Sequence, residues 1–226
     1  MFFLNCRYSW KVASPLARKP ADQTVNSKDI ILAAAEVLRN NGYEATTMKD
    51  IAAQVNLTAA SLYYHFRNKD ALLLAVLEYG LDHVVERIEP VVKTDKTNTE
   101  KLAEMIKLHV VSVTKNTTVG AAMVFEIRSL MNPKTSSGKS KNNQAFIERR
   151  DSFFARRDRF EELFQQVVQA GVDDGEFSPV DVAIFVKTIL GAQNWVGVWY
   201  REGGRLDGET VAQMMAETFL KALKHQ

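Results

Sequence analysis

Residues 46–72, TTMKDIAAQVNLTAASLYYHFRNKDAL, constrain the fold of this chain more than any other stretch. Thr47 and Asp50 have the three-residue spacing of a capping box, so a short helix is expected to begin there. Asn56 follows that helix where a left-handed residue would end it, a conformation that Asn tolerates better than most residues. Thr58 can then cap a second short helix. Two short helices joined by so tight a turn predict a helix-turn-helix.

The second short helix has one face for a core and another for a partner. Leu62 and Phe66 lie one helical turn apart and are expected to face the core. Tyr63 and Tyr64 are consecutive, so at least one of them must face away from it. A further helix is predicted over 69–92, long enough to leave this unit and continue into the next part of the chain.

This stretch resembles the DNA-binding region of the TetR family of bacterial transcriptional regulators. The resemblance covers about residues 27–75 and departs from the family pattern at Asn56, where glycine is usual. The segments that carry it are 30–38, Gly42-Tyr43, 46–52, 55–57 and 61–72.

The resemblance implies an all-α protein of about nine helices, with a three-helix DNA-binding head followed by a helical ligand-binding and dimerisation domain. We place a flexible arm at 1–26, the head at 27–75 and the second domain at 76–226. Composition agrees, because 46% of the residues are hydrophobic and there are only five prolines and eleven glycines. Strand-like alternation is scarce, which favours helices throughout.

The predicted DNA interface follows from the resemblance and from the position of each residue. Lys69 begins a helix, where its ammonium and the free backbone N–H groups could meet one phosphate. The resemblance implies phosphate-side contacts for Tyr63, Tyr64 and His65, and guanine recognition for Lys49. Few base contacts are expected, so DNA shape should contribute to specificity. The full predicted set is Thr47, Lys49, Thr58, Ala59, Ala60, Ser61, Tyr63, Tyr64, His65 and Lys69.

Charge, cysteine and histidine content exclude several other classes of protein. Residues 1–70 hold nine Lys/Arg and six Asp/Glu, a bias too small to prove nucleic-acid binding by itself. The single Cys6 excludes an internal disulfide and fits a reducing cytoplasm. Widely spaced histidines make no metal-ligand cluster, so no metal, cofactor or catalysis is expected. No run approaches the 18 apolar residues of a membrane span, so no membrane partner is expected.

A ligand pocket is implied for the second domain. The run 191–206, GAQNWVGVWYREGGRL, is similar to that of acyl-CoA- and lipid-responsive family members, so an acyl-CoA or fatty acid is the expected effector. Polar residues on apolar helices suit such a pocket, although each can also be an exposed or internally satisfied group. A basic cluster could meet a CoA phosphate or form a solvated helix face: Lys139, Lys141, Arg149, Arg150, Arg156, Arg157 and Arg159. The predicted pocket residues are Met105, His109, Phe125, Arg128, Phe164, Asn194 and Trp195.

A homodimer is predicted on the last two helices. The helix expected over 182–200 carries too much apolar surface for a single core-facing stripe. Gly191 and Gly197 remove side chains where a second helix could approach closely. The predicted interface residues are Ile189, Gly191, Ala192, Trp195, Trp199, Met215 and Phe219. Such pairing would present two heads to a palindromic operator on double-stranded DNA.

Two functions are compatible with these features. The favoured one is a repressor that a small apolar or acyl-CoA-type ligand releases from its operator. The alternative is a helical lipid carrier or enzyme in which the head is only structural. Salt-dependent binding to duplex DNA distinguishes them, because several phosphate contacts demand a steep fall of affinity with salt.

Overall fold

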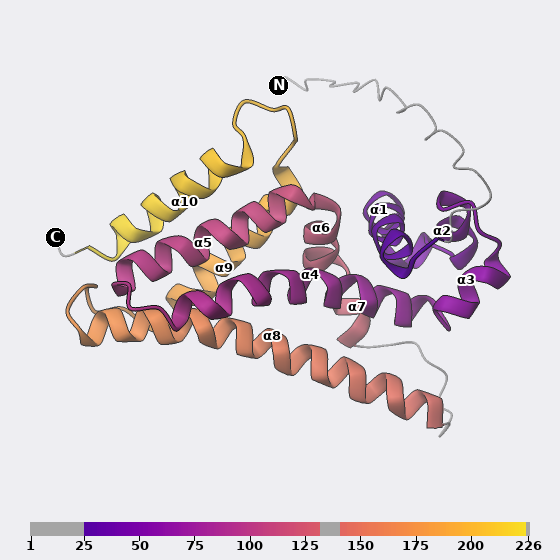
Figure 1. Ribbon diagram of the computed structural model, residues 1–226, viewed down its shortest axis with the longest axis horizontal. Helices are drawn as coiled ribbons and strands as arrows, with labels where there is room; N and C mark the ends of the chain where they lie inside the picture. The colour runs from indigo at the N-terminus through magenta and orange to yellow at the C-terminus, as the bar shows by residue number, and fades with distance from the viewer. Residues whose placement is uncertain (1–24, 132–140, 225–226) are drawn as a thin grey trace, which may run out of the picture.

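The computed structural model describes residues 25–131 and 141–224, and the described chain is all-helical, as predicted (Figure 1). The predicted arm at 1–26 therefore lies almost entirely outside the described residues. Ten helices are present in the described ranges, one more than expected: α1 Ser27–Ala45, α2 Met48–Gln54, α3 Ala59–His65, α4 Lys69–Val92, α5 Asn98–Lys115, α6 Thr117–Phe125, α7 Ile127–Met131, α8 Lys141–Asp173, α9 Val182–Trp199 and α10 Gly208–Ala222.

The caps that define the head form as the sequence predicts. The Thr47 hydroxyl accepts a hydrogen bond from the Asp50 backbone N–H at 3.2 Å. In return, the Asp50 carboxylate accepts one from the Thr47 backbone N–H at 2.9 Å. Asn56 has φ 56°, so the turn between α2 and α3 does use a left-handed residue. Thr58 caps α3 by accepting from the Ser61 N–H. These local bonds fix where α2 and α3 begin and how they are joined.

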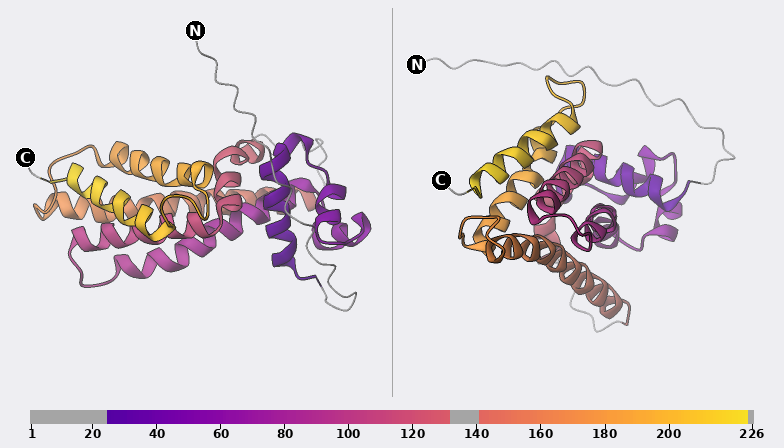
Figure 2. Two further views of the ribbon diagram at one scale, coloured as in Figure 1. Left: turned by 90° about the horizontal axis from the view of Figure 1, so that it is seen from above. Right: turned by 60° about the vertical axis from the view of Figure 1, so that its left-hand side comes forward.

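Helix α4 connects the head with the rest of the molecule. Asn68 caps it, and its first turns pack against α1 in a continuous buried run, residues 72–77. Figure 1 shows α4 extending from the indigo head into the helical body, and Figure 2 shows the head at one end of that body. One unbroken helix thus joins the two parts, so a movement of α4 in the body displaces the head.

The body is built around α5, which contacts α4, α8, α9 and α10. A capping box of Thr97 and Glu100 begins α5. Glu176, from the loop after α8, adds a second cap by accepting from the backbone N–H groups of Asn98 and Thr99, each at 2.9 Å. Desolvation of Glu176 opposes these bonds, but they outweigh it and hold the pKa of its carboxyl below the usual value.

A break at Glu126 separates α6 from α7, and this division accounts for the one helix more than expected. Burial raises the pKa of the Glu126 carboxyl above its ordinary value, while a hydrogen bond from the Tyr43 backbone and the charge of Lys69 act in the other direction. Glu126 therefore lies beside the end of α1 and the start of α4. The break places an acidic side chain where the body meets the head, a contact that helical periodicity could not predict.

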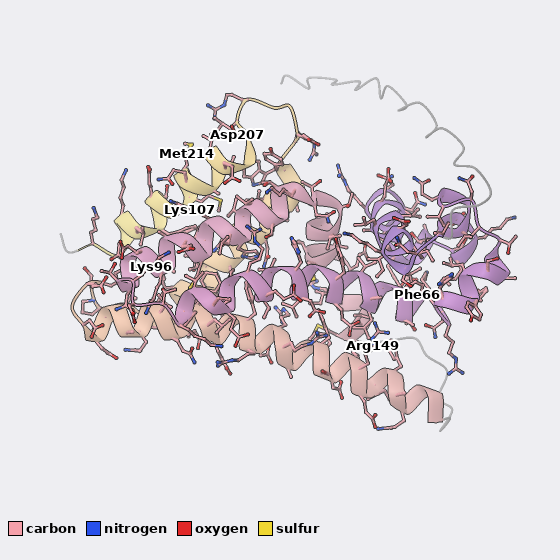
Figure 3. All side chains as sticks on the ribbon, viewed as in Figure 1. Phe66, Lys96, Lys107, Arg149, Asp207 and Met214 are labelled. Atoms are coloured by element: carbon pink, nitrogen blue, oxygen red, sulfur yellow. The ribbon has the colours of Figure 1, made fainter. Side chains whose placement is uncertain are left out.

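A network of ion pairs links α8 to α4. Arg149 forms a forked pair with Glu78, and Arg156 bridges Glu78 and Asp82. Figure 3 shows Arg149 between the two helices. The Glu78 side chain is only 13% exposed, so its charge is better shielded from water than those of the arginines. These two arginines are thus engaged within the protomer, which argues against the CoA-phosphate interpretation for this part of the basic cluster.

Two glycines allow α6 and α9 to approach closely. A Cβ at Gly197 would lie 3.0 Å from the carbonyl carbon of Gly120, closer than real Cβ atoms normally come. Close approach of another helix at Gly197 was predicted, with a second copy of the chain as the partner. The partner in that prediction is wrong, because the helix that approaches Gly197 is α6 of the same protomer. Gly191 has no atom within 4 Å of such a Cβ and remains open.

Candidate DNA-binding and ligand sites

Helix α3 presents a recognition surface to solvent. Leu62 and Phe66 are buried, as predicted, and fix which side of the helix faces the core. Tyr63 is 51% and Tyr64 90% exposed, so both tyrosines face outward, whereas the sequence required this of only one. Other members of the predicted DNA set are exposed as well: Thr47, Lys49, Thr58, Ala60, Ser61 and His65. Ala59 is half-buried.

The hydroxyl groups around this surface are occupied by caps. Thr47 Oγ1 donates to the Asp50 carboxylate at 2.7 Å, which, with the backbone bond from Thr47, lowers the pKa of Asp50. Thr58 and Ser61 share a hydroxyl–hydroxyl bond of 2.9 Å. Thr47 was predicted to donate to DNA, but here its proton is directed to Asp50. The outward side of the helix carries an aromatic pair, Tyr64 and His65, whose rings meet edge-on with their centres 5.7 Å apart.

Lys69 has partners that the sequence did not indicate. Its ammonium donates to the carbonyl oxygens of Tyr43 at 2.6 Å and Thr46 at 2.9 Å, and lies 4.1 Å from the centre of the Tyr43 ring. A cation beside the last carbonyls of α1 is stabilising, because those groups have no partners within the helix. The predicted phosphate contact would have to share this ammonium with α1.

The same junction contains a half-buried tyrosine. The Tyr43 hydroxyl donates a hydrogen bond to the Asp70 carboxylate. Burial is the largest cause that raises the pKa of Tyr43, followed by the bond to Asp70. Together with Lys69, this bond fixes the end of α1 against the first turn of α4, so the orientation of the head on α4 depends on it.

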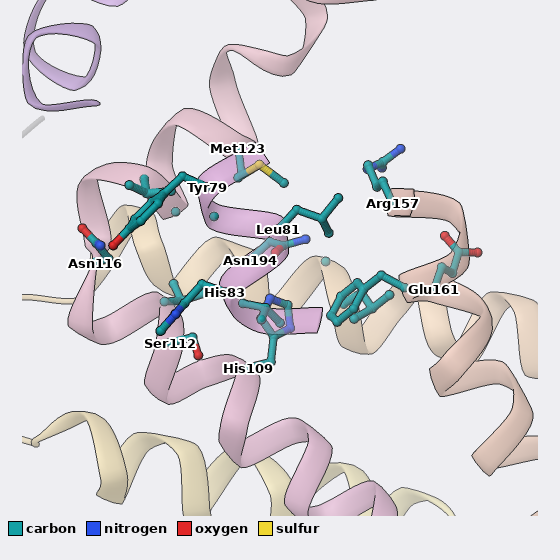
Figure 4. Close-up of a pocket in the computed structure, with 18 of the residues that line it drawn as sticks. Tyr79, Leu81, His83, His109, Ser112, Asn116, Met123, Arg157, Glu161 and Asn194 are labelled. Carbon is teal, nitrogen blue, oxygen red and sulfur yellow. The ribbon is translucent and has the colours of Figure 1, made fainter. Parts of the chain in front are cut away.

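The body contains a partly open cavity of about 340 Å³ between α4, α5, α6, α8 and α9 (Figure 4). A cavity of this size suits a small ligand, and its wall combines apolar side chains with several polar and charged ones. The apolar lining residues are Leu81, Val84, Val113, Val119, Met123, Phe160 and Leu190. Two elements that border it also contact the head: α4 is continuous with the head, and α6 packs on α1.

His109 is the most deeply buried polar group of this wall, with 4% of its surface exposed. Its Nδ1 lies 3.1 Å from Oε1 of Gln193, and its ring meets Phe160 edge-on at 5.3 Å. Burial lowers the pKa of His109 to about 4, with bonds to Gln193 and Asn194 acting in the opposite direction. The imidazole is therefore neutral at pH 7.

Charged side chains border one side of the cavity. Arg157 and Glu161 from α8 and Lys187 from α9 line it, and Lys187 pairs with Glu161 at 2.6 Å. Figure 4 places Arg157 and Glu161 on the side opposite Tyr79 and Asn116. A ligand with an anionic end could direct that end to Arg157, which is exposed.

The cavity includes two of the seven predicted ligand residues, His109 and Asn194. Met105 and Phe164 are fully buried in the core and do not line it. Phe125 and Trp195 are about half exposed and meet each other edge-on on the outside of the body, and Arg128 is exposed. The apolar pattern indicates which residues belong to the helical body, but it does not show which of them line the cavity.

Most of the cavity wall was not predicted from the sequence. Tyr79 and His83 stack with ring centres 6.5 Å apart and both line the cavity, yet in the sequence they are ordinary members of α4. Arg157 belonged to the predicted basic cluster, so this residue carried a signal. Within the described residues, no group of three or more His, Cys, Asp or Glu is arranged to hold a metal.

The outer face of α9 carries an exposed apolar stripe. We define this outer stripe as Ile184, Thr188, Trp195 and Trp199, which lie four or seven residues apart along the helix. Trp195 and Trp199 belong to the predicted dimer set, whereas Gly191 of that set lines the cavity and Ile189 is fully buried in the protomer core, contrary to its predicted role. The other predicted residues, Ala192, Met215 and Phe219, are half-buried, and Met214 is 50% exposed.

This stripe also explains the composition of α9. By length and composition alone, α9 could cross a membrane, although only a third of it is buried inside the protein. One face of α9 packs on α5, α6 and α8, and the opposite face carries the outer stripe. Two apolar faces on one helix give high hydropathy without any need for a lipid environment.

An exposed helix on a helix-turn-helix head, joined by one helix to a body with a partly open cavity, defines a DNA-binding regulator of the helix-turn-helix class. Residues 30–76 match the family described as bacterial regulatory proteins, tetR family, and residues 95–223 match the tetracyclin repressor-like C-terminal domain. The second match alone covers more than half of the chain. The protein belongs to the TetR family.

Curated relatives and solved structures agree with this assignment. The transcriptional repressor KstR2 of Rhodococcus jostii is 27% identical over 210 residues, which cover 90% of this chain and 96% of that protein. The structure of PfmR, a TetR family regulator of Thermus thermophilus, is 28% identical with a TM-score of 0.72, covering 87% of this chain and 99% of that one. AibR, solved with isovaleryl coenzyme A and operator DNA, is 27% identical with a TM-score of 0.65, covering 85% and 96%.

Proposed function

We propose that this protein is a transcriptional repressor that binds a palindromic operator as a homodimer and leaves it when an apolar or acyl-CoA-type ligand enters the cavity. One observation carries the proposal: the cavity is bordered by α4, which is continuous with the head, and by α6, which packs on α1. A ligand held there touches both connections between body and head.

The coupling follows from differential fit. A ligand changes DNA affinity only if it binds one arrangement of α4 and α6 more tightly than the other. Gly80 of α4 has no room for a Cβ, because Val119 of α6 lies 2.6 Å from where that atom would be. With the two helices so closely packed beside the cavity, a ligand that separates them must also displace α1 or the first turn of α4.

DNA recognition would use the exposed face of α3. Tyr63, Tyr64 and His65 would lie along the phosphates, and Lys49 would reach a base, while the N-terminus of α4 offers backbone N–H groups to a phosphate. Since α3 has alanines at its start, direct base contacts are few and DNA shape should matter. Two heads separated by about 34–36 Å would fit successive major grooves, which requires a dimer.

The relatives support the choice of ligand class. AibR was solved with isovaleryl coenzyme A, and a fatty acid metabolism regulator protein of Bacillus subtilis is 35% identical over 80 residues, though these cover only 35% of this chain. In this chain, Arg157 at the border and the apolar interior would suit a thioester whose acyl group is enclosed and whose phosphates remain outside.

A DNA-release titration tests the proposal. Operator fragments are first selected from random and genomic duplexes with the purified protein. Acyl-CoAs of graded chain length are then added to the complex while fluorescence anisotropy of the DNA is recorded. Release by a subset of chain lengths is expected. If none of these acyl-CoAs or the matching free fatty acids releases DNA, this ligand class is wrong.

The alternative, a lipid carrier or enzyme with a structural head, makes a different prediction for the same protein. Without phosphate contacts, binding to duplex DNA would be weak and nearly independent of salt. The proposed repressor should lose affinity steeply as salt rises, because each phosphate contact releases a counterion. Such a regulator acts on DNA in the cytoplasm.

A further inference from the structure

The orientation of one buried amide decides what the cavity can bind. Gln193 is fully buried on α9, and its Nε2 donates to the Ile189 carbonyl oxygen at 3.1 Å. A carbonyl oxygen can only accept, so the atom that faces it must be the amide nitrogen. The other end of the Gln193 amide, the end directed at α5, is therefore the oxygen.

That orientation fixes the tautomer of His109. Oε1 of Gln193 lies 3.1 Å from His109 Nδ1, and an amide oxygen can only accept. Nδ1 must then carry the proton. In a neutral imidazole the second nitrogen, Nε2, is left as an acceptor without a proton. Burial, which lowers the pKa of His109 to about 4, agrees with the neutral form.

The surroundings of His109 leave few ways to satisfy Nε2. Phe160 covers one side of the ring edge-on. The wall also carries polar groups, of which Glu161 and Lys187 are paired with each other. Ser112 also lines the cavity, but its hydroxyl donates to the Leu108 carbonyl oxygen and accepts from Arg87. Asn194, within reach of the same imidazole, lines the cavity beside His109, as Figure 4 shows. Its amide supplies both a donor and an acceptor.

We infer that the interior of the cavity selects a ligand with a hydroxyl group on its apolar part, which donates to His109 Nε2 and accepts from the Asn194 amide. This inference rests on the proposed function and adds the ligand's chemistry. A ketone or carboxylate oxygen in the same place would set a second acceptor against Nε2, and a methylene would leave Nε2 and the Asn194 amide with only each other as partners. The ligand is thus a hydroxylated acyl chain or ring.

The tautomer can be measured without any ligand. Full-length protein labelled with ¹⁵N-histidine is examined by two-bond ¹H–¹⁵N correlation spectroscopy, in which protonated and unprotonated ring nitrogens have well separated shifts. The expected result at pH 7 is one histidine with a protonated Nδ1 and a bare Nε2, assigned by its loss in His109→Phe. A His109 signal with its proton on Nε2 overturns the inference.

Matched ligands test the hydroxyl preference. The probes are decanoyl-CoA and derivatives with a hydroxyl or a keto group at one chain position, with that position moved along the chain. Titration calorimetry on the protein without DNA should find one position where the hydroxyl form binds about tenfold more tightly than the methylene and keto forms, as one net hydrogen bond provides. Equal binding at every position, or failure of all these probes to bind, overturns the inference.

Two variants separate the parts of the argument. In His109→Phe, which keeps a ring of similar size, the hydroxyl preference should disappear while decanoyl-CoA still binds. In Gln193→Leu, the imidazole is free to carry its proton on Nε2, where it can donate to a keto oxygen. The preference for the hydroxyl over the keto ligand should therefore fall, while the preference for the hydroxyl over the methylene ligand should persist. A preference that survives His109→Phe contradicts the assignment to His109. Because binding is measured without DNA, a probe that binds selectively but does not release DNA counts against the proposed function alone.

Discussion

At the residue scale, Lys69 shows how one side chain can have two roles. The first turn of α4 is suited to a phosphate because the positive end of the helix dipole lies there, although the Asn68 side chain already accepts from the Ala71 N–H. In the structure, however, the Lys69 ammonium binds carbonyl oxygens at the end of α1. It therefore stabilises the head whether or not it also meets DNA.

Replacing Lys69 separates these two roles. Lys69→Met keeps the apolar stem but removes the ammonium, so the free energy of unfolding should fall by about 1–3 kcal/mol. If Lys69 also contacts a phosphate, the slope of the logarithm of DNA affinity against the logarithm of salt concentration should become less steep by about one. Urea unfolding and anisotropy at several salt concentrations measure both. Lys49→Met is the matched control, because Lys49 is exposed and should alter DNA binding without a loss of stability.

The buried His109 makes stability depend on pH. Its pKa is lowered from 6.5 to about 4 by burial, so the unfolded chain takes up a proton first as pH falls. The stabilisation is complete above pH 6.5 and is lost as pH falls toward 4, by about 2 kcal/mol between pH 7 and 5. Urea unfolding at both pH values should show a larger loss for the wild type than for His109→Gln. Equal losses would mean that His109 does not titrate in this window.

At the scale of elements, the contact between α6 and α9 depends on glycine. A Cβ at Gly197 would lie 3.0–3.1 Å from backbone atoms of Gly120 and Ala121, and backbone cannot rotate away as a flexible side chain can. The two helices therefore approach as closely as their backbones allow. Since α6 also packs on α1, this spacing helps to set the position of the head.

A pair of alanine substitutions tests that spacing. Gly197→Ala should destabilise the protein by about 1–3 kcal/mol through overpacking, even though alanine favours helix. Gly191→Ala, on the same helix with no neighbour within 4 Å, should be neutral or should stabilise by up to about 1 kcal/mol. Thermal unfolding of both variants gives the comparison. The idea fails if Gly197→Ala is as well tolerated as Gly191→Ala.

At the scale of the whole molecule, the outer stripe of α9 remains exposed in the single chain. Ile184, Trp195 and Trp199 are 61%, 50% and 48% exposed, and Phe125 meets Trp195 at the edge of the stripe. Contiguous exposed apolar surface on a soluble protein usually marks an interface. Because a helix-turn-helix reads only a short half-site, pairing of two copies through this face would also provide specificity.

Charge on the outer stripe should break the dimer. The double variant Trp195→Glu, Trp199→Glu is expected to give folded monomers that lose specific operator binding, since both side chains are already half exposed in the protomer. Sedimentation velocity and circular dichroism measure assembly and folding. Met131→Glu is the control, because Met131 is 62% exposed on α7 and lies off the stripe. A monomeric wild type that still binds a palindrome tightly would refute this arrangement.

The sequence by itself determined the local architecture of this protein. The capping box of Thr47 and Asp50, the left-handed Asn56 and the cap at Thr58 act within a few residues, so their effect can be inferred from spacing alone. The periodic apolar residues likewise fixed the all-helical class and the length of α4. These features depend on bonds between near neighbours in the chain, and near neighbours are visible in the sequence.

Only the tertiary structure decided which residues far apart in the chain meet. In the folded protein, the Lys69 ammonium binds the end of α1 and Gly197 lies against α6. Ile189 is buried within the protomer, and Phe125 lies outside the cavity. Periodicity shows that a helix has an apolar face, but two apolar faces on α9 cannot be assigned to a core and an outer surface without the neighbouring helices. The cavity wall is drawn from five helices, and their relative positions depend on packing across the whole body rather than on any one segment.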